Sequence, residues 1–257
     1  MKNFTSAQFF PAEHFDAATV MANFFPRWTN FLPLKIAICA GAVAGGVVMA
    51  FTYYATPKTL TAGYQPSQPI PFSHKIHVDQ LQLDCRYCHS FEDISGTSNV
   101  PSSNTCWNCH RHVQKESPKL QPLRDRMDPA LKSPDFGKPV QWVRVHKLPD
   151  FVYFNHSAHL NRGVSCQVCH GQVDQMEVIY QKNSLSMGWC LECHRDPGQF
   201  VRPLEEVFNL KYDKEVYFKT HQAEMQRLGA VTPDDIGKKL VEHWNIHTKE
   251  TCATCHH

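Results

Sequence analysis

The sequence predicts short α-helices and long loops with little regular secondary structure, behind one N-terminal transmembrane helix. Three observations predict this fold class. The motif C-x-x-C-H occurs five times, and every C-x-x-C pair in the 257 residues is followed by His. A charge-free apolar run covers residues 36–54, and Pro (17) outnumbers Gly (12) in a chain with long stretches that lack periodicity. Because C-x-x-C-H is the attachment signature of c-type haem, five porphyrins are expected to replace most of a conventional apolar core.

In this motif the two thiols bond to one porphyrin and the adjacent His is aimed at the iron as its proximal ligand. The fold class is therefore that of a multihaem cytochrome c with five c-type haems, numbered here as motifs 1 to 5 in chain order. The predicted attachment residues are Cys85, Cys88, Cys106, Cys109, Cys166, Cys169, Cys190, Cys193, Cys252 and Cys255. The predicted proximal ligands are His89, His110, His170, His194 and His256.

Zinc sites and disulfides are the competing explanations for paired cysteines. A zinc site takes four ligands from two clusters, and a disulfide framework suits a secreted protein. Neither needs a His directly after every second Cys, so haem is the preferred interpretation. The eleventh cysteine, Cys39, lies in the apolar run. It is interpreted as a small membrane-buried residue, with a functional thiol as the alternative.

Residues 31–56 are predicted to form a transmembrane anchor helix. The apolar run within them has nineteen residues without a charge, enough to span a hydrocarbon core. A cleaved secretory signal is the alternative, but it would have a shorter apolar region and a small-x-small cleavage site. The run instead ends in Tyr53 and Tyr54, an aromatic pair typical of a membrane interface. An uncleaved anchor is therefore preferred.

The orientation follows from charge and from chemistry. Arg27 and Lys35 precede the span and Lys58 follows it, a slight bias toward a cytoplasmic N-terminus. Bacterial c-type haem is attached outside the cytoplasmic membrane, so we expect a Phe-rich cytoplasmic arm at residues 1–30 and a periplasmic haem domain. Gly41 and Gly45 form a small-x-x-x-small face for another membrane helix, unless they reflect only the frequency of Gly in such helices. The formal net charge of +2 indicates no nucleic-acid partner.

The soluble part contains an internal repeat. The pattern F-x-H-x-x-H precedes motif 1, with His74 and His77, and precedes motif 3, with His156 and His159. Residues 57–71, which are rich in Pro, Thr and Gln, are predicted to form a tether, and residues 72–257 the haem domain. Within the haem domain the repeats are predicted at about 72–150, 151–230 and, in part, 231–257.

Two further elements are expected from local patterns. The stretch 111–150 is punctuated by Pro and is predicted to be mostly loop. Thr232 is an N-cap with Pro at the first turn and an acid at N3. That cap predicts a helix to about His247, which would place His243 and His247 on one face.

The F-x-H-x-x-H stretches resemble those of the class III multihaem cytochromes, of the c3 and c7 kind. In that family the first His ligates the haem of the next attachment motif and the second ligates a neighbouring haem. The resemblance therefore implies that His74 serves motif 1 and His156 motif 3, while His77 and His159 serve motifs 2 and 4.

The fifth distal ligand is left open by this resemblance. Trihaem members have it just before their second attachment motif, where this chain has Met187 and no His. An axial thioether raises the haem potential relative to a second His, although Met is more often a packing residue. His243, nine residues before motif 5, and His146 and His247 are the other candidates.

The layout as a whole resembles the pentahaem cytochrome c subunit of bacterial alternative complex III. The resemblance is carried by the anchor, the five motifs and the stretches 143–156 (VRVHKLPDFVYFNH) and 187–195 (MGWCLECHR). It implies that the chain is a subunit and not an enzyme by itself. The complex would be an oxidoreductase that passes electrons from quinol to cytochrome c or a high-potential acceptor, and this subunit would relay them. The implied partners are integral membrane subunits, an iron–sulfur subunit and, as acceptor, a monohaem cytochrome or a terminal oxidase.

Two rival functions belong to other classes. A quinol dehydrogenase of the NapC/NrfH kind has one span and four or five haems, but here motif 1 lies about thirty residues beyond the span and the F-x-H-x-x-H pairs are present. A multihaem reductase for nitrite or a similar substrate usually needs an open iron, often with a Lys ligand. All five motifs end in His, which disfavours the reductase.

Overall fold

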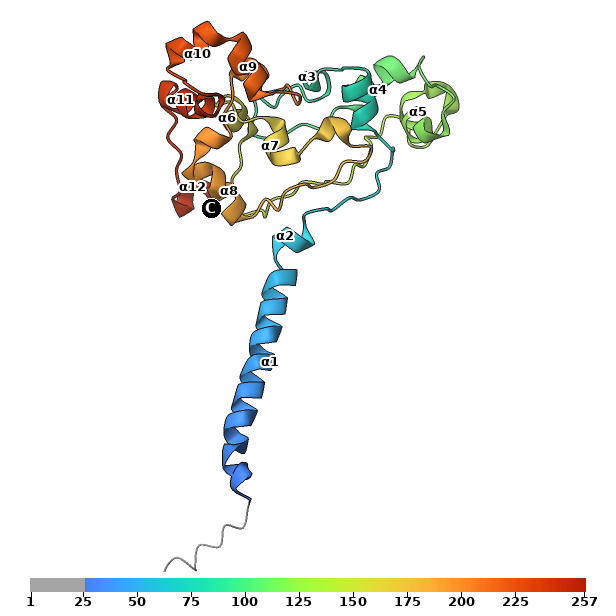
Figure 1. Cartoon of the computed structure of the whole chain (residues 1–257). Coiled ribbons are helices and arrows are strands. Elements are labelled where there is room, and N and C mark those ends of the chain that lie inside the picture. Colours follow the sequence, from blue (N-terminus) through green and yellow to red (C-terminus); the bar gives the residue numbers. More distant parts are fainter. Residues whose placement is uncertain (1–25) are drawn as a thin grey trace, which may run out of the picture. The chain divides into compact units, whose positions relative to one another are not determined.

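The computed structural model describes residues 26–257 (Figure 1). It divides into two units, one ending at Tyr54 and one comprising Ala55–His257, and each is considered by itself. Most of the predicted N-terminal arm, residues 1–25, lies outside the described residues.

The first unit is a single apolar helix. A 3₁₀ turn at Arg27–Phe31 leads into α1, Leu32–Tyr54. None of the residues of α1 is buried within the protein, and its apolar residues lie on all sides, which is the pattern of a membrane span and not of a surface helix. At 1.5 Å per residue, the 23 residues of α1 reach roughly 35 Å. The prediction of one N-terminal apolar helix is confirmed, and α1 is long and apolar enough to cross a membrane.

The second unit consists of short helices joined by loops. No strand occurs among its described residues, only isolated bridges between Val152 and His256 and between Val164 and Val201. The longest helix, α8, has nine residues, so the prediction of little regular secondary structure is confirmed. The helices are α2 (Pro57–Leu60), α3 (Cys85–Cys88), α4 (Ser103–His110), α5 (Gln121–Met127), α6 (His156–Leu160), α7 (Cys166–His170), α8 (Met187–Arg195), α9 (Lys214–Thr220), α10 (Gln222–Leu228), α11 (Ile236–His243) and α12 (Cys252–Cys255).

The helix predicted from residue 232 begins as expected but ends early. Thr232 and Asp235 form a reciprocal capping box around a 3₁₀ turn, and α11 follows. The helix stops at His243 because the next turn opens and Asn245 adopts a left-handed conformation with φ 50°. His247 therefore lies beyond the helix, and the prediction that it shares a helical face with His243 is wrong.

The apolar core is small for a unit of this length. Only thirteen hydrophobic side chains are buried in the described part of the chain. Six of them form one cluster beneath α9, α10 and α11: Val201, Tyr217, Met225, Ala230, Ile236 and Leu240. Such a core cannot by itself offset the conformational entropy of about 200 ordered residues. Something other than side chains is needed to fill the interior around the attachment motifs.

The stretch 57–71, predicted as a tether, is for the most part hydrogen-bonded along the domain. Gly63 N donates to the Gln181 carbonyl at 2.7 Å and Gln181 N donates to the Tyr64 carbonyl at 3.0 Å. Gln65 Nε2 reaches the Val178 carbonyl at 2.9 Å. Gln68 also exchanges two hydrogen bonds of 2.9 Å with the Val143 backbone. Residues 61–68 therefore belong to the domain and not to a free linker.

The loop predicted for 111–150 is interrupted by α5, which packs against α4. Leu123 on α5 is only 1% exposed. Pro118 and Pro122 lie in the first turns of a 3₁₀ turn and of α5, where a missing N–H costs nothing. The Pro punctuation therefore marked helix starts as well as loops.

A close backbone crossing generates a stability prediction. Gly237 of α11 packs on the 3₁₀ turn Pro197–Gln199, and a Cβ at residue 237 would lie 2.1 Å from the Gly198 carbonyl oxygen. We expect Gly237→Ala to lower the free energy of unfolding by about 3 kcal/mol or more, because backbone must move to admit the methyl group. Gly229→Ala is the control, since nothing lies within 4 Å of its Cβ position; its positive φ limits the cost to roughly 1–2 kcal/mol. Denaturant unfolding of the haem-loaded domain measures both, and equal losses would contradict the crossing.

Candidate haem-binding sites

Each attachment motif lies on a short helix that begins at or before its first cysteine. Cysteines three residues apart fall on one face of a helix, so both thiols of a motif can reach one porphyrin edge. The caps fix where two of these helices begin. The Asp84 carboxylate accepts from Arg86 N at 2.8 Å ahead of motif 1, and the Ser186 hydroxyl accepts from Trp189 N ahead of motif 4.

The arrangement does not suit the two rival explanations for the cysteines. All eleven cysteines are free thiols, so the described chain holds no disulfide. Within residues 26–257 there is also no group of three or more His, Cys, Asp and Glu side chains that could enclose a metal ion by itself. Each motif instead offers two thiols and a separate imidazole, which is the donor set of a covalently attached haem.

Three pairs of histidines lie at the spacing that an iron between them requires. The ring centroids are 6.1 Å apart for His77 and His110 and 6.3 Å apart for His159 and His194. They are 6.5 Å apart for His156 and His170, whose planes differ by only 10°. Two metal–nitrogen bonds of about 2 Å, plus the distance from each nitrogen to its ring centre, sum to roughly 6.3 Å. The residues present therefore fit haem iron at motifs 2, 3 and 4.

A fourth pair is brought together at motif 1. His74 lies near both His89 and His77: burial, and then repulsion from these two rings, lowers the pKa of His74 to about 4. Burial also lowers the pKa of His170 to about 3, with further contributions from His146, His156 and His89. Imidazoles with lowered pKa values are neutral at neutral pH, the form in which His binds a metal.

Hydrogen bonds orient most of these rings for iron. The Nδ1 atoms of the proximal His89, His110 and His194 lie 3.0–3.1 Å from the backbone carbonyls of residues 99, 113 and 249. The Nδ1 atoms of His77 and His159 lie 2.8 and 2.7 Å from the carbonyls four residues earlier. An Nδ1–H that donates to a carbonyl fixes the tautomer and leaves Nε2 as the basic nitrogen for a metal.

The F-x-H-x-x-H pattern also uses its aromatic residue. Phe72 stacks on His77 at 4.4 Å and meets His74 edge-on at 4.9 Å. Phe154 repeats both contacts with His159, at 4.6 Å, and with His156, at 4.7 Å. Each Phe thus holds two imidazoles apart at a fixed angle, so that they serve two different irons.

The four candidates for the fifth distal ligand are placed differently. The His146 ring lies 4.3 Å from His170 and edge-on to it, too close for an iron between them. His243 ends α11, and His247 Nε2 lies 2.7 Å from Asn245 Oδ1. Met187 lies at the start of α8 with 65% of its surface exposed, so it is not a packing residue of the described fold.

Met187 shares a helical face with Cys190, three residues later. Burial raises the pKa of the Cys190 thiol, and Cys255 of motif 5 raises it further, which shows that motifs 4 and 5 lie side by side. Met187 therefore lies on the helix that carries motif 4, next to motif 5.

The five motifs are not arranged in chain order. Burial raises the pKa of the Cys88 thiol in motif 1, and Cys109 of motif 2 adds to that rise. Burial raises the pKa of Cys166 in motif 3 to about 11, with Cys85 of motif 1 as the next contribution. Charge effects of this kind act between nearby groups, so motif 1 neighbours both motif 2 and motif 3.

The second half of the row follows in the same way. Burial raises the pKa of Cys169 in motif 3 to about 12, and both thiols of motif 4 raise it further. The Thr248 hydroxyl donates to the His194 carbonyl, and Arg195 Nε lies 3.1 Å from a Glu250 oxygen, so the approach to motif 5 runs over motif 4. The motifs therefore form a row in the order 2, 1, 3, 4, 5.

A buried carboxylate that the sequence analysis missed lies beside motif 1. Glu92 is 9% exposed. One of its oxygens accepts from Asn99 N at 3.0 Å and lies 3.7 Å from His89 Nδ1. The other oxygen has no hydrogen-bond partner among the described residues. Glu92 shares burial with Asp174, which is 3% exposed, and only the fold reveals that either acid is buried.

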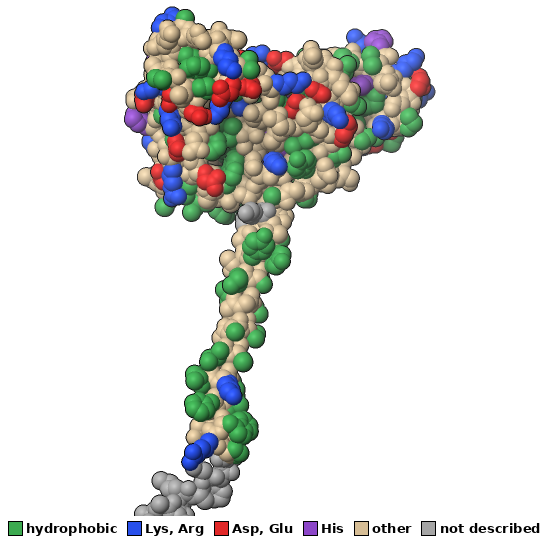
Figure 2. Space-filling model, viewed as in Figure 1, with side chains coloured by type: hydrophobic (Ala, Val, Ile, Leu, Met, Phe, Trp, Pro, Cys, Tyr) green, Lys and Arg blue, Asp and Glu red, His purple; other side chains and the backbone are tan. Residues whose placement is uncertain are grey.

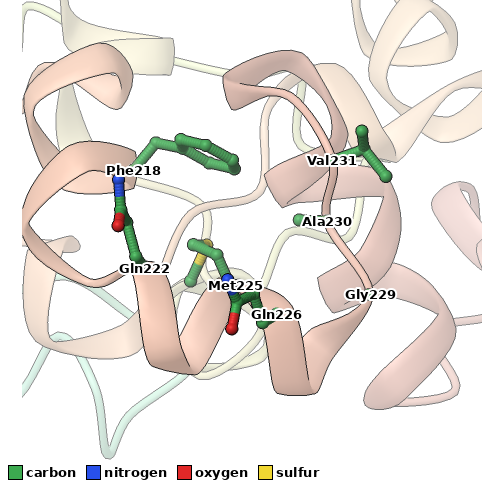
Figure 3. A pocket seen from close by; sticks show the side chains of 7 residues that line it. All are labelled: Phe218, Gln222, Met225, Gln226, Gly229, Ala230 and Val231. Carbon is green, nitrogen blue, oxygen red and sulfur yellow. The ribbon is translucent and has the colours of Figure 1, made fainter.

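The described fold also contains a hollow of about 480 Å³ beside α10 (Figure 3). None of its lining side chains carries an acid, a base or a nucleophile, so it has no means of catalysing a reaction. Its lining residues are Phe218, Gln222, Met225, Gln226, Gly229, Ala230 and Val231.

The position of Glu92 generates a prediction about haem potential. A negative charge near the proximal His favours the oxidised iron. At an effective dielectric of about 20 and roughly 7 Å from the iron, it is worth ~2 kcal/mol, or on the order of 100 mV for one electron. We expect Glu92→Gln to raise one of the midpoint potentials by roughly 50–100 mV, while Glu242→Gln at an exposed position leaves all of them unchanged. Spectroelectrochemical titration measures both variants, and unaltered potentials in Glu92→Gln would contradict the prediction.

Comparison with known proteins agrees with this geometry. Residues 152–257, which contain motifs 3 to 5, match the family described as "Cytochrome c7 and related cytochrome c". The chain is also 30% identical to the "Menaquinone reductase, multiheme cytochrome c subunit" of Nitratidesulfovibrio vulgaris (strain Hildenborough), over 61% of this chain and 82% of that subunit. The predicted resemblance to c7-type cytochromes is thereby confirmed, and the chain belongs to the multihaem cytochrome c family.

Proposed function

We propose that this chain is the electron-relay subunit of a membrane complex that exchanges electrons with the quinone pool. The three histidine pairs with centroids 6.1–6.5 Å apart carry the proposal. Haem, when bound, supplies a one-electron carrier at each site. At motifs 2, 3 and 4 a pair of histidines would close both faces of an iron and leave no position for a substrate, which favours electron transfer.

The proposed ligand assignment is supported by the ring spacing at motifs 2, 3 and 4 and is extended from there to motifs 1 and 5. His74, His77, His156 and His159 are the distal ligands for motifs 1, 2, 3 and 4, opposite the proximal residue of each motif. Met187 is the distal ligand of motif 5, opposite His256, because α8 carries it toward that motif. A Met ligand raises the potential of a haem above that given by a second His. Motif 5 is therefore the high-potential end of the row.

The row of motifs supports a relay across the domain. Each motif neighbours the next in the order 2, 1, 3, 4, 5, so an electron can pass through the chain in four steps between adjacent sites. The protein contributes fixed spacing, because each porphyrin is held by two thioethers and two axial side chains. It also contributes site-specific potentials, through axial ligand, burial and hydrogen bonding.

The wider setting is proposed from the two resemblances. The arrangement of anchor and motifs is similar to the pentahaem subunit of alternative complex III, which takes electrons from quinol oxidation. By itself the chain is then no enzyme. It is held in the bacterial inner membrane by α1, with residues 1–30 in the cytoplasm and the haem domain in the periplasm. Its partners are integral membrane subunits, an iron–sulfur subunit and a cytochrome or terminal oxidase as acceptor.

The relative from N. vulgaris favours a second candidate, electron flow in the opposite direction. That protein is a subunit of a menaquinone reductase, so the same row of haems would carry electrons toward quinone. The sites are identical in both cases. The direction depends on the potentials of the donor and acceptor and not on the positions of the ligands.

Removal of one distal ligand tests the ligand assignment. His77→Ala should convert one haem of the five to high spin, because the ring opposite His110 is lost. His112→Ala is the control, since His112 is exposed and forms none of the pairs. Electron paramagnetic resonance and near-infrared magnetic circular dichroism count low-spin haems. Five low-spin haems in His77→Ala would remove His77 as a ligand.

A quinol assay tests the proposed function. The haem-loaded chain purified alone should not be reduced by menaquinol, whereas the same chain in its native complex should be reduced within the turnover time. Rapid reduction of the isolated chain would instead identify a NapC/NrfH-like quinol dehydrogenase. If the haems of the native complex are neither reduced by quinol nor oxidised by quinone, both directions of the proposal are contradicted.

A further inference from the structure

The positive charge of the haem domain is concentrated in one segment. Residues 111–147, termed here the basic lobe, contain nine Lys and Arg and four Asp and Glu. The rest of the unit Ala55–His257 contains fourteen Lys and Arg and eighteen Asp and Glu. The basic lobe therefore has a net charge of +5 on a domain that is otherwise −4. Haem propionates would increase this contrast.

The acidic residues within the basic lobe are already engaged. Asp125 accepts from Gln121 Nε2 at 2.7 Å, Asp128 caps Ala130 N at 2.9 Å, and Asp135 lies 3.3 Å from Lys138 Nζ. Five exposed cations form no ion pair among the described residues: Arg111, Lys119, Lys132, Arg144 and Lys147. Of these, Arg144 donates to the His146 carbonyl. Their charge is therefore directed to solvent and not to the fold. Figure 2 shows Lys and Arg side chains on the surface of this lobe, around the position of α5 in Figure 1.

Exposed apolar side chains accompany these cations. Leu131 is 46% exposed and Phe136 51% exposed, on either side of Lys132 in the sequence. Their loop is held against α5 by a hydrogen bond from Gly137 N to the Arg126 carbonyl at 2.9 Å. Exposed apolar side chains with a charged rim are characteristic of a protein–protein contact.

The basic lobe adjoins the end of the row of haems. It begins immediately after motif 2, and its helix α5 packs against α4, which carries that motif. His110 Nδ1 lies 3.1 Å from the Val113 carbonyl, and Cys109 is exposed. Of the five helices that carry the motifs, α4 lies nearest to α5 of the basic lobe in Figure 1, and it packs against α5. Motif 2 is thus a terminal site that opens onto the basic lobe.

We propose that the basic lobe is the docking surface for a small acidic one-electron carrier that exchanges electrons with motif 2. The proposal rests on the proposed relay function. In each encounter one electron leaves the haem of motif 2 and reduces the partner's redox centre, or leaves the partner's centre and reduces that haem. No bond is made or broken. The free cations steer an acidic partner to this end of the row, and a charged and exposed rim permits fast release. A permanent subunit interface would be more apolar.

The experiment uses one probe protein in two charge states. A small soluble c-type cytochrome serves as the acceptor, either with its basic surface lysines intact or with those lysines succinylated, which makes it acidic. The full-length haem-loaded chain in detergent is reduced first and mixed with each form in a stopped-flow instrument. Two double variants with equal change of charge are compared, Lys119→Glu with Lys132→Glu in the basic lobe and Lys219→Glu with Arg227→Glu outside it. All four residues are exposed.

We expect the acidic probe to react about ten-fold faster than the basic probe at low ionic strength, and the difference to shrink as salt is added. The variant in the basic lobe should lower the rate with the acidic probe about ten-fold and remove most of its salt dependence. The variant outside the lobe should change that rate less than about two-fold, because steering depends on charge near the docking site. Affinity for the acidic probe, measured by biolayer interferometry, should follow the same order.

Three outcomes would overturn the docking surface. The basic probe could react as fast as the acidic one, or the two double variants could slow the reaction equally. Alternatively, the variant in the basic lobe could leave the rate unchanged while other subunits no longer copurify, which would make the lobe a permanent contact. Each result leaves the relay itself intact, because reduction of the haems by quinol in the native complex is measured separately.

Discussion

The hydrogen bond between an imidazole Nδ1 and a backbone carbonyl is the interaction on which the rest of the haem domain depends. It occurs in three histidines predicted to be proximal ligands and two proposed as distal ligands, and in each it leaves Nε2 as the nitrogen for a metal. The carbonyls come from the same turn for His77 and His159, but from residues 99 and 249 for His89 and His194. Loop conformation and ligand orientation are therefore coupled. The histidine pairs reach a spacing of 6.1–6.5 Å only because these loops are in place.

This coupling explains how a domain with so few buried hydrophobic side chains can be ordered. Helices of four to nine residues are unstable alone, and the cluster beneath α9, α10 and α11 supports only the segment from Val201 to Ile246. Elsewhere, two thioethers and two axial ligands per haem would join segments that are distant in sequence. Those bonds reduce the entropy of the unfolded chain, and the porphyrins supply apolar area for packing. Folding and cofactor attachment are then one process. The basic lobe adjoins motif 2, at the opposite end of the row from motif 5, the proposed high-potential site.

Local patterns predicted the parts of this fold whose causes are local. The five motifs, the anchor, the capping box at Thr232 and the pairing of each F-x-H-x-x-H stretch with its motifs all depend on residues within one or two helical turns. The order of the motifs was not predictable, because it depends on contacts such as that between Cys85 and Cys166, 81 residues apart. The burial of Glu92, the contact of His146 with His170 and the docking of residues 61–65 beside residues 178–184 were missed for the same reason. The end of α11 was misplaced because Asn245, which adopts a left-handed conformation, carries little signal in sequence.

The central claim is that one row of five haems runs through the domain in the order of motifs 2, 1, 3, 4 and 5. Anomalous X-ray diffraction at the iron edge, on crystals of the haem-loaded domain, tests it most directly. The account predicts five iron positions, one between the rings of each of the pairs His77 and His110, His156 and His170, and His159 and His194, with the iron of motif 1 between those of motifs 2 and 3. Fewer than five irons, irons outside these pairs, or an iron of motif 2 that lies between two others would contradict the account.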